Sequence, residues 1–193
     1  MKNILFKFRT ICLSALCLFT VINQAQAKEF VVLPGDVLQI SVWKEEGMDK
    51  EVLVLPDGSI TFPLVGTIYI QGKPPFEVQD QIANQLSMYI PDATVDVSVK
   101  APLGHKASVL GQVQKPGDVI LGGNTNVMQA ISQVGGLTPY ADEDDIVVIR
   151  TLNNGKKISI PYPYDDLIRG RNFDKDVDLE PGDVVIVETD GLF

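Results

Sequence analysis

The 193-residue chain has little cysteine, little histidine and few cationic side chains. Its two cysteines, Cys12 and Cys17, lie near the N-terminus, and His105 is its single histidine. Acidic residues (25) outnumber Lys and Arg (16), which gives a net charge of -9. This balance argues against binding to nucleic acid, because neutralising a phosphate backbone requires a cationic face. A hydrophobic content of 45% argues against a disordered chain.

The N-terminal segment is typical of a secretory signal peptide. Three cationic residues precede an uncharged apolar stretch over residues 11–22, and alanines at positions 25 and 27 supply the small side chains of a cleavage site. An uncleaved membrane anchor is the alternative, but the apolar stretch is shorter than the roughly 20 residues that a membrane-spanning helix needs. We therefore predict that residues 1–27 are a cleavable signal peptide, which favours a bacterial periplasmic or outer-envelope location for the mature protein.

Cleavage would change both the charge and the chemistry of the chain. It would remove three of the 16 cationic residues and none of the 25 acidic ones, so 13 Lys and Arg would remain and the net charge would become -12. It would also remove both cysteines, so no disulfide, thiol nucleophile or cysteine-bound metal would serve the mature protein. We expect a strongly acidic protein that uses no cofactor.

One tetrapeptide, Pro-Gly-Asp-Val, occurs three times in the chain. Its copies are Pro34–Val37, Pro116–Val119 and Pro181–Val184, and each precedes a β-prone apolar run. Proline suits the first central position of a type II turn, and glycine supplies the positive φ that the second position requires. The pattern predicts three sharp turns, each leading into a strand.

A mixture of strands and one helix is predicted for residues 30–100. Apolar residues at helical spacing indicate an amphipathic helix over residues 76–89, whose apolar stripe needs a sheet to cover. The turn at Pro56-Asp57-Gly58 predicts a β-hairpin between the strands that flank it. The strands expected in this region cover residues 37–43, 51–55, 59–62, 65–70 and 94–99.

A second unit is predicted after a short linker over residues 101–106, in which His105 would be solvated. Asn124-Thr125-Asn126 offers a cap for a helix that Gly135-Gly136 would end. Short strands around a single helix predict a small α+β domain of β-grasp type. Strands are expected over residues 107–113, 118–121 and 183–188, a hairpin over 146–152 and 156–160, and one helical turn over 165–171.

These two regions resemble two known domains. Residues 32–43 and the stretches 55–60 and 63–66 resemble the bacterial polysaccharide export domain. Residues 109–117 and 129–137 resemble the soluble-ligand-binding β-grasp domain that follows it in outer-membrane polysaccharide exporters. The resemblance implies an α+β protein with a mixed-sheet polysaccharide export domain over residues 28–101, which contains one helix, and a small β-grasp-like domain over residues 107–190.

The resemblance implies a role in moving capsular or extracellular polysaccharide through the periplasm and across the outer membrane, as a homo-oligomeric ring. The sequence ends soon after its last predicted strand, so we expect a short form without the C-terminal pore helix of larger family members. It would act as a conduit or adaptor associated with the outer membrane. The partners implied are the polysaccharide, an inner-membrane polysaccharide co-polymerase and a separate outer-membrane β-barrel protein.

The sequence does not support an enzyme. A Ser-His-acid triad would have to use His105, and no Gly-x-Ser-x-Gly motif occurs. The four acids of residues 142–145 are expected to lie in a solvated loop. Two alternatives stay open: a periplasmic glycan-modifying enzyme that uses a carboxylate pair, and a monomeric glycan-binding module.

A metal site is not predicted either. Asp174, Asp176 and Asp178 imitate the start of a calcium-binding loop, but the glycine and glutamate that such a loop requires are replaced by Leu179 and Val185. We expect the three aspartates to face solvent ahead of the last turn.

Aromatic residues are the candidates for contact with sugar rings, because the apolar face of a pyranose packs well on an aromatic ring. Tyr162 and Tyr164 flank Pro163 in an expected loop, and we predict that they are the most exposed of the aromatic residues. They are therefore the candidate glycan-contact residues. The other aromatic candidates considered are Trp43, Tyr69, Tyr89 and Tyr140.

Overall fold

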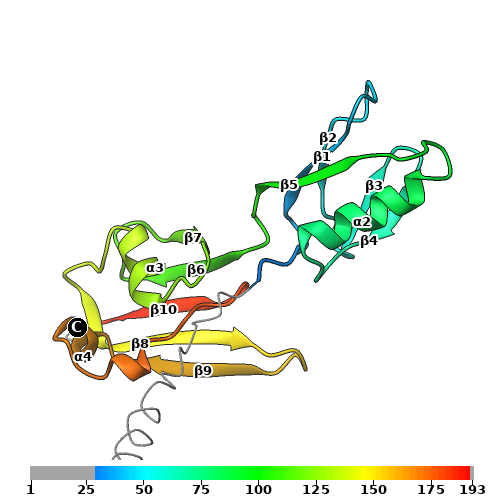
Figure 1. The fold of residues 1–193 in the computed structure, drawn as a ribbon. Coiled ribbons are helices and arrows are strands. Elements are labelled where there is room, and N and C mark those ends of the chain that lie inside the picture. Colours follow the sequence, from blue (N-terminus) through cyan, green and yellow to red (C-terminus); the bar gives the residue numbers. More distant parts are fainter. Residues whose placement is uncertain (1–28, 192–193) are drawn as a thin grey trace, which may run out of the picture.

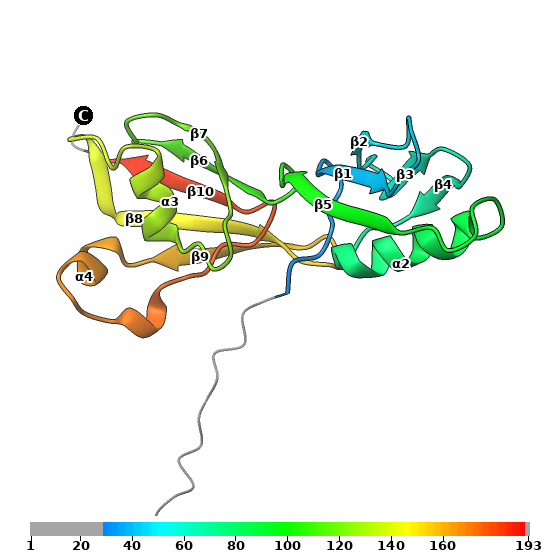
Figure 2. The same cartoon turned by 45° about the horizontal axis from the view of Figure 1, so that its top comes forward.

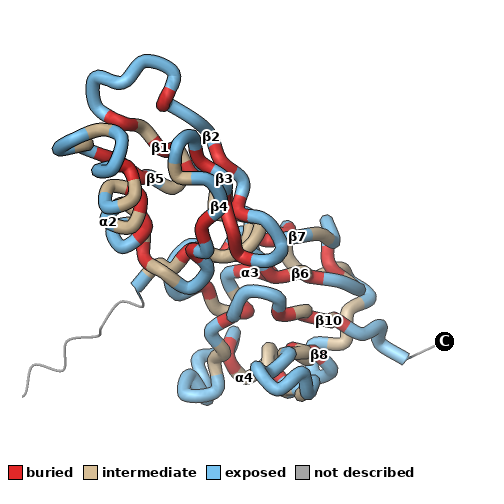
Figure 3. The backbone as a smooth tube through the Cα atoms, turned by 90° about the vertical axis from the view of Figure 1, so that its right-hand side faces the viewer, coloured by how far each residue is buried: buried red, intermediate tan, exposed pale blue. Residues whose placement is uncertain are grey.

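The computed structural model describes residues 29–191. The signal peptide predicted for residues 1–27 lies outside the described residues. Two α+β units lie end to end, joined by the short segment 102–105 (Figures 1 and 2). Each unit has a hydrophobic core of its own, and no buried residue belongs to both cores. Buried residues, coloured red in Figure 3, occur in both units.

The first unit combines a three-stranded antiparallel sheet, ordered β2-β1-β5, with a separate two-stranded sheet, β3-β4. Helix α2 packs along β5 (Figures 1 and 2). Strand β1 alternates half-buried and buried residues, as expected for a strand with one face on a core. The elements are β1 (Val37–Val42), β2 (Lys50–Leu53), β3 (Ser59–Phe62), β4 (Gly66–Tyr69), α2 (Pro75–Leu86) and β5 (Val95–Ala101).

Helix α2 confirms the predicted amphipathic helix but ends three residues earlier than expected. Pro75 occupies the first turn, where its missing N–H costs no hydrogen bond. Val78, Ile82 and Leu86 are fully buried in one stripe. After Leu86 the amides of Tyr89 and Ile90 both bond to the Leu86 carbonyl, so the chain turns away and Tyr89 is left exposed.

The hairpin predicted around Pro56-Asp57-Gly58 is wrong in its pairing. The turn itself forms, since the Leu55 amide donates to the Ser59 carbonyl at 2.9 Å. However, β2 pairs with β1 and β3 pairs with β4, so the two strands flanking the turn belong to different sheets. Local turn chemistry predicted the reversal correctly, but the choice of partner depends on packing across the whole unit.

The second unit is a five-stranded mixed sheet ordered β7-β6-β10-β8-β9, with α3 on one face (Figures 1 and 2). The last strand, β10, lies at its centre, parallel to β6 and antiparallel to β8. This arrangement confirms the predicted β-grasp-like architecture. The elements are β6 (Lys106–Gly111), β7 (Gly117–Ile120), α3 (Val127–Gln133), β8 (Ala141–Thr151), β9 (Lys157–Tyr162), α4 (Tyr164–Ile168), a 3₁₀ turn η1 (Phe173–Lys175) and β10 (Val184–Thr189).

Helix α3 begins as its sequence predicts. The Asn126 side chain accepts a hydrogen bond from the Gln129 amide at 2.8 Å, and the Gln129 side chain accepts one from the Asn126 amide at 3.1 Å. This reciprocal capping box satisfies two amides that the helix leaves unpaired. Gly135 and Gly136 follow with φ values of 91° and 86°, which end the helix.

Two of the three Pro-Gly-Asp-Val turns form as predicted. Gly35 and Gly182 have φ values of 94° and 89°, and in each turn the aspartate amide bonds to the carbonyl three residues earlier. The prediction is wrong for the middle copy. Gly117 does not adopt a positive φ and already lies in β7, where Asp118 pairs with Ser108 of β6.

The prediction that the acidic run at residues 142–145 lies in a solvated loop is also wrong. The run lies within β8 rather than in a loop, although residues 143–145 are exposed as expected. Strand β8 extends because Ala141 pairs with Thr189 of β10 beyond an irregularity in the register.

Over residues 29–191, no helix has the length and apolar character needed to cross a bilayer.

Candidate functional site

A buried carboxylate ties the two units together. Asp36 is fully buried, and its Oδ2 accepts a hydrogen bond of 2.8 Å from the Leu33 amide within its own turn. Its Oδ1 accepts a second bond of 2.8 Å from the Gly104 amide, which belongs to the connecting segment. A buried carboxylate requires such partners, because leaving it unpaired would be costly. The junction is therefore an ordered contact.

His105 completes this junction, so the prediction that it is solvated is wrong. Its side chain is 14% exposed, and its Nε2 lies 3.0 Å from the Val31 carbonyl oxygen and 3.4 Å from Asp36 Oδ2. The imidazole also packs on the Phe30 ring, with centroids 4.4 Å apart. The segment around Gly104 contained typical linker residues, and nothing local indicated the carboxylate that it meets.

Gly104 allows the close approach at this junction. A Cβ at this position would lie 2.6 Å from the Pro34 carbonyl oxygen and 2.9 Å from the Leu33 Cβ. We expect Gly104→Ala to break the Gly104–Asp36 contact at a cost of about 1–3 kcal/mol, with both hydrophobic cores kept. Small-angle scattering would then show a broader distribution of distances between the two units.

Gly122→Ala is the matched control for this substitution, because an added Cβ there meets no atom within 4 Å. An unchanged scattering profile for Gly104→Ala would contradict the junction described here.

A cleft of about 480 Å³ opens beside the junction. One wall comes from the segment 29–33 of the first unit, the other from segments 121–124 and 178–181 of the second, and His105 lies between them. Leu121 and Leu179 are buried apolar residues of its wall. Clefts of this size at domain interfaces are common ligand sites, since such sites measure about 300–1,000 Å³.

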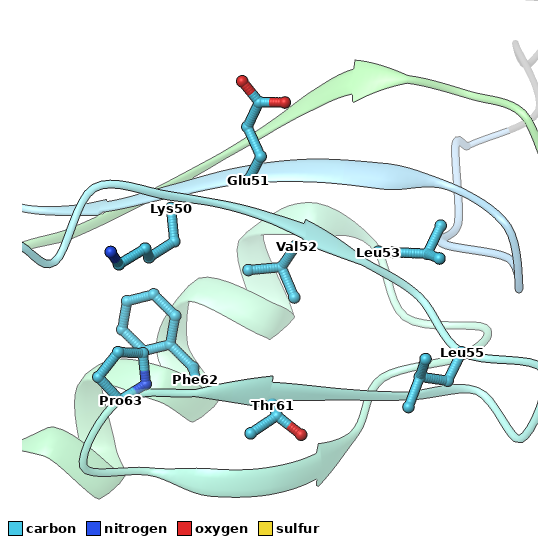
Figure 4. Close-up of a pocket in the computed structure, with 8 residues that line it drawn as sticks. All are labelled: Lys50, Glu51, Val52, Leu53, Leu55, Thr61, Phe62 and Pro63. Carbon is cyan, nitrogen blue, oxygen red and sulfur yellow. The ribbon is translucent and has the colours of Figure 1, made fainter.

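A second concave region lies on the first unit, between β2 and β3 (Figure 4). It measures about 510 Å³. The side chains of Lys50, Val52 and Phe62 lie between the two strands, whereas Glu51 points away from them (Figure 4). Neither strand is paired with the other, so this groove runs between two strand edges. Edges of this kind offer backbone groups for pairing with a further strand.

The predicted glycan-contact residues differ in their surroundings. The expected exposure of Tyr162 is wrong: it is 1% exposed and its hydroxyl donates to Asp176 Oδ1 at 3.0 Å. Burial, together with the Asp176 carboxylate, raises the pKa of Tyr162 well above its usual value. Its ring belongs to the hydrophobic core of the second unit. Tyr164 is half-buried, so the prediction of greatest exposure is wrong for it as well; its role as a glycan contact stays a prediction. The other aromatic candidates are more exposed than both tyrosines: Trp43, Tyr69, Tyr89 and Tyr140.

The three aspartates of the calcium-like sequence are not equivalent in the structure. The expectation that all face solvent is wrong for Asp176, which also accepts a hydrogen bond of 2.8 Å from Asn126 Nδ2. Asp176 thereby links the 3₁₀ turn to the cap of α3. Asp174 and Asp178 are exposed. In the part of the chain that the structure describes, no three His, Cys, Asp or Glu side chains gather in a way that could hold a metal.

The second buried carboxylate, Asp183, is structural. Asp183 is 2% exposed and accepts hydrogen bonds from Arg150 Nη2 at 2.6 Å and from the Glu180 amide at 2.8 Å. The hydrogen bonds that Arg150 donates to Asp183 raise the pKa of its guanidinium. The repeated tetrapeptide was the sequence signal for both Asp36 and Asp183, although it did not distinguish them from exposed Asp118.

The fold defines a two-unit α+β protein with a first unit of two antiparallel sheets and one helix and a β-grasp-like second unit. Comparison with known families agrees with this division. Residues 24–100 match the polysaccharide biosynthesis/export protein family, and residues 105–187 match the SLBB domain. Residues 24–100 are thus a domain of the polysaccharide export family, and residues 105–187 are an SLBB domain.

Several curated proteins are similar to the chain. It is 25% identical to the EPS I polysaccharide export outer membrane protein EpsA of Ralstonia nicotianae, over 85% of this chain and 48% of EpsA. It is 27% identical to the capsule polysaccharide export protein BexD of Haemophilus influenzae, over 78% of this chain and 41% of BexD. The polysialic acid transport protein KpsD of Escherichia coli is 27% identical, over 74% of this chain and 25% of KpsD. The chain thus spans half or less of the length of these relatives.

Proposed function

We propose that this protein takes part in the export of capsular or extracellular polysaccharide through the bacterial cell envelope, as a subunit that catalyses no reaction. The observation that carries the proposal is the order of the two family matches, each of which falls on a unit with its own hydrophobic core. The names of the similar proteins, all of which refer to polysaccharide export or transport, support the same role.

The surroundings of the charged side chains support a role without catalysis. The two buried aspartates of the repeated turns hold backbone amides and, for Asp183, an arginine, so they serve the fold. His105 is engaged with Val31 and Phe30 at the junction. A general base needs access to substrate within hydrogen-bond reach, and these groups are occupied by the protein itself.

The proposal includes assembly with further chains in the periplasm, at the outer membrane. The outer strands β2 and β5 of the first sheet have one unpaired edge each within the described residues. Pairing of such edges between copies would build the homo-oligomer that we predict. The inner-membrane co-polymerase and the outer-membrane β-barrel protein stay predicted partners. The domain boundaries proposed are residues 28–101 and 107–190, with a cleavable signal over residues 1–27.

A deletion strain tests the export role. We expect loss of the gene to reduce cell-surface or secreted polysaccharide by at least about tenfold and to leave polymer inside the envelope, because a missing conduit blocks transport and not synthesis. Polymer would be measured by carbohydrate assay of surface, periplasmic and cytoplasmic fractions. Unchanged surface polymer would refute the proposal, and turnover of the host polymer by the purified protein would favour the glycan-modifying enzyme.

A further inference from the structure

The cleft between the two units has the features of a carbohydrate site. Its volume of about 480 Å³ is enough for a small ligand. Its lining combines apolar and polar side chains, and it is formed by His105 and three segments that lie far apart in the sequence. Neither the family matches nor the names of the similar proteins assign a ligand to this place.

The apolar part of the cleft can accept the flat face of a sugar ring. Phe30 is half-buried and lines the cleft together with His105, whose ring it contacts. Leu121 and Leu179 lie on the opposite unit. Aromatic and aliphatic surfaces of this kind suit the C–H face of a pyranose, while its hydroxyl groups need polar partners.

The polar part of the cleft consists mainly of hydrogen-bond acceptors with negative charge. Glu29, Asp178 and Glu180 line it and are exposed, and Asn124 adds an amide that can donate and accept. Carboxylate oxygens accept hydrogen bonds from sugar hydroxyls. The arrangement therefore offers several acceptors around one apolar surface.

The charge around the cleft decides which sugars fit. Arg150 lies near the cleft, since its Nη2 donates to the Asp178 carbonyl oxygen at 2.8 Å. It is also paired with Glu180 at 3.2 Å and with buried Asp183 at 2.6 Å, so its charge is already balanced. No Lys or Arg is among the described residues that line the cleft. An acidic sugar placed there would face Glu29 and Asp178 without a compensating cation, which is unfavourable.

We propose that the cleft between the two units binds a segment of polysaccharide that carries no acidic group. This inference depends on the proposed export function for the origin of the polymer, and it adds the place of contact and the charge class of the sugar. A bound segment would contact both units at once and thereby stabilise their relative orientation at the Gly104–Asp36 contact.

The test is an NMR titration of the purified full-length mature protein with trisaccharides. The neutral probes are cellotriose, maltotriose and mannotriose, and the acidic probe is trigalacturonate. We expect at least one neutral probe to shift the amide resonances of residues 29–33, 121–124 and 178–181, with a dissociation constant of about 1 mM. Trigalacturonate should bind at least about tenfold more weakly.

Two substitutions locate the site. Phe30→Ala should weaken binding of the neutral probe about three- to tenfold, as expected for loss of one aromatic contact. Phe173→Ala removes an aromatic ring that is 68% exposed and lies outside the cleft lining, so it is the matched control and should leave binding unchanged. Asn124→Ala, on an exposed loop, tests the same cleft if Phe30→Ala lowers the amount of folded protein.

A charge substitution tests the selectivity. Glu29→Lys should strengthen binding of trigalacturonate and change binding of the neutral probe less than about twofold. Glu46→Lys, in the exposed loop between β1 and β2, is its control. The inference is overturned if no neutral probe binds at about 10 mM, if the shifts lie elsewhere, or if trigalacturonate binds as tightly as the neutral probes. The titration measures binding without export, so it separates failure of this site from failure of the export role.

Discussion

Replacing Asp183 with asparagine is expected to destabilise the second unit by about 3 kcal/mol, which corresponds to a fall in Tm of about 10–20 °C. The carboxylate is 2% exposed and accepts hydrogen bonds from Arg150 Nε and Nη2 and from the Glu180 amide. Without its charge, the Arg150 guanidinium, which is 16% exposed, would lose its main partner while staying largely desolvated. The turn that leads into central strand β10 would weaken at the same time.

The same tetrapeptide supplies a matched control. Asp118 occupies the equivalent sequence position in the middle copy, but it lies on the surface of β7 and bonds to Lys106 and Ser108 at 2.6 and 2.7 Å. These hydrogen bonds lower the pKa of Asp118, yet exposed pairs of this kind contribute little to stability. Thermal unfolding followed by circular dichroism should show no change in Tm for Asp118→Asn. Equal effects of the two substitutions would contradict the distinction drawn between the turns.

Gly111→Ala is expected to destabilise the second unit by about 2–5 kcal/mol, from an unfavourable backbone conformation together with a steric overlap. Gly111 ends β6 with a φ of 90°, and an added Cβ would overlap the carbonyl oxygen of Val187 in β10. The overlap would fall within the parallel pairing of β6 with β10, at the centre of the sheet. Because Val187 O is a backbone atom of a central strand, the clash cannot be relieved by moving a flexible side chain.

Urea unfolding would measure this effect, with Gly117→Ala as the control. Gly117 lies in β7, the edge strand of the same sheet, and a Cβ there meets no atom within 4 Å. At such a position alanine is expected to be neutral or slightly stabilising, because it restricts the unfolded chain. A Gly111→Ala protein with an unchanged unfolding midpoint would show that the β6–β10 pairing is not as described.

Local signals in the sequence determined most individual elements of this protein. The apolar spacing of Val78, Ile82 and Leu86 predicts α2, and the Asn126 cap with Gly135-Gly136 predicts α3. These features depend on contacts between residues a few positions apart, so the sequence contains their cause directly. The family resemblance of the two regions was confirmed as well. It could be detected in the sequence because it depends on short motifs of neighbouring residues.

Tertiary structure alone decided which strands pair and which side chains are buried. Nothing in Pro56-Asp57-Gly58 indicates that β2 and β3 belong to different sheets. The three identical tetrapeptides do not indicate that two of their aspartates are buried and the third is exposed. His105 lies in a stretch that is typical of a linker, yet Phe30 and Val31 contact it from about 75 positions away in the chain. Tyr162 lies in a stretch that is typical of a loop, yet its hydroxyl bonds to Asp176, 14 positions further on. The cleft between the units likewise joins residues about 150 positions apart, and such proximity is a property of the packed molecule because a local pattern carries no information about it.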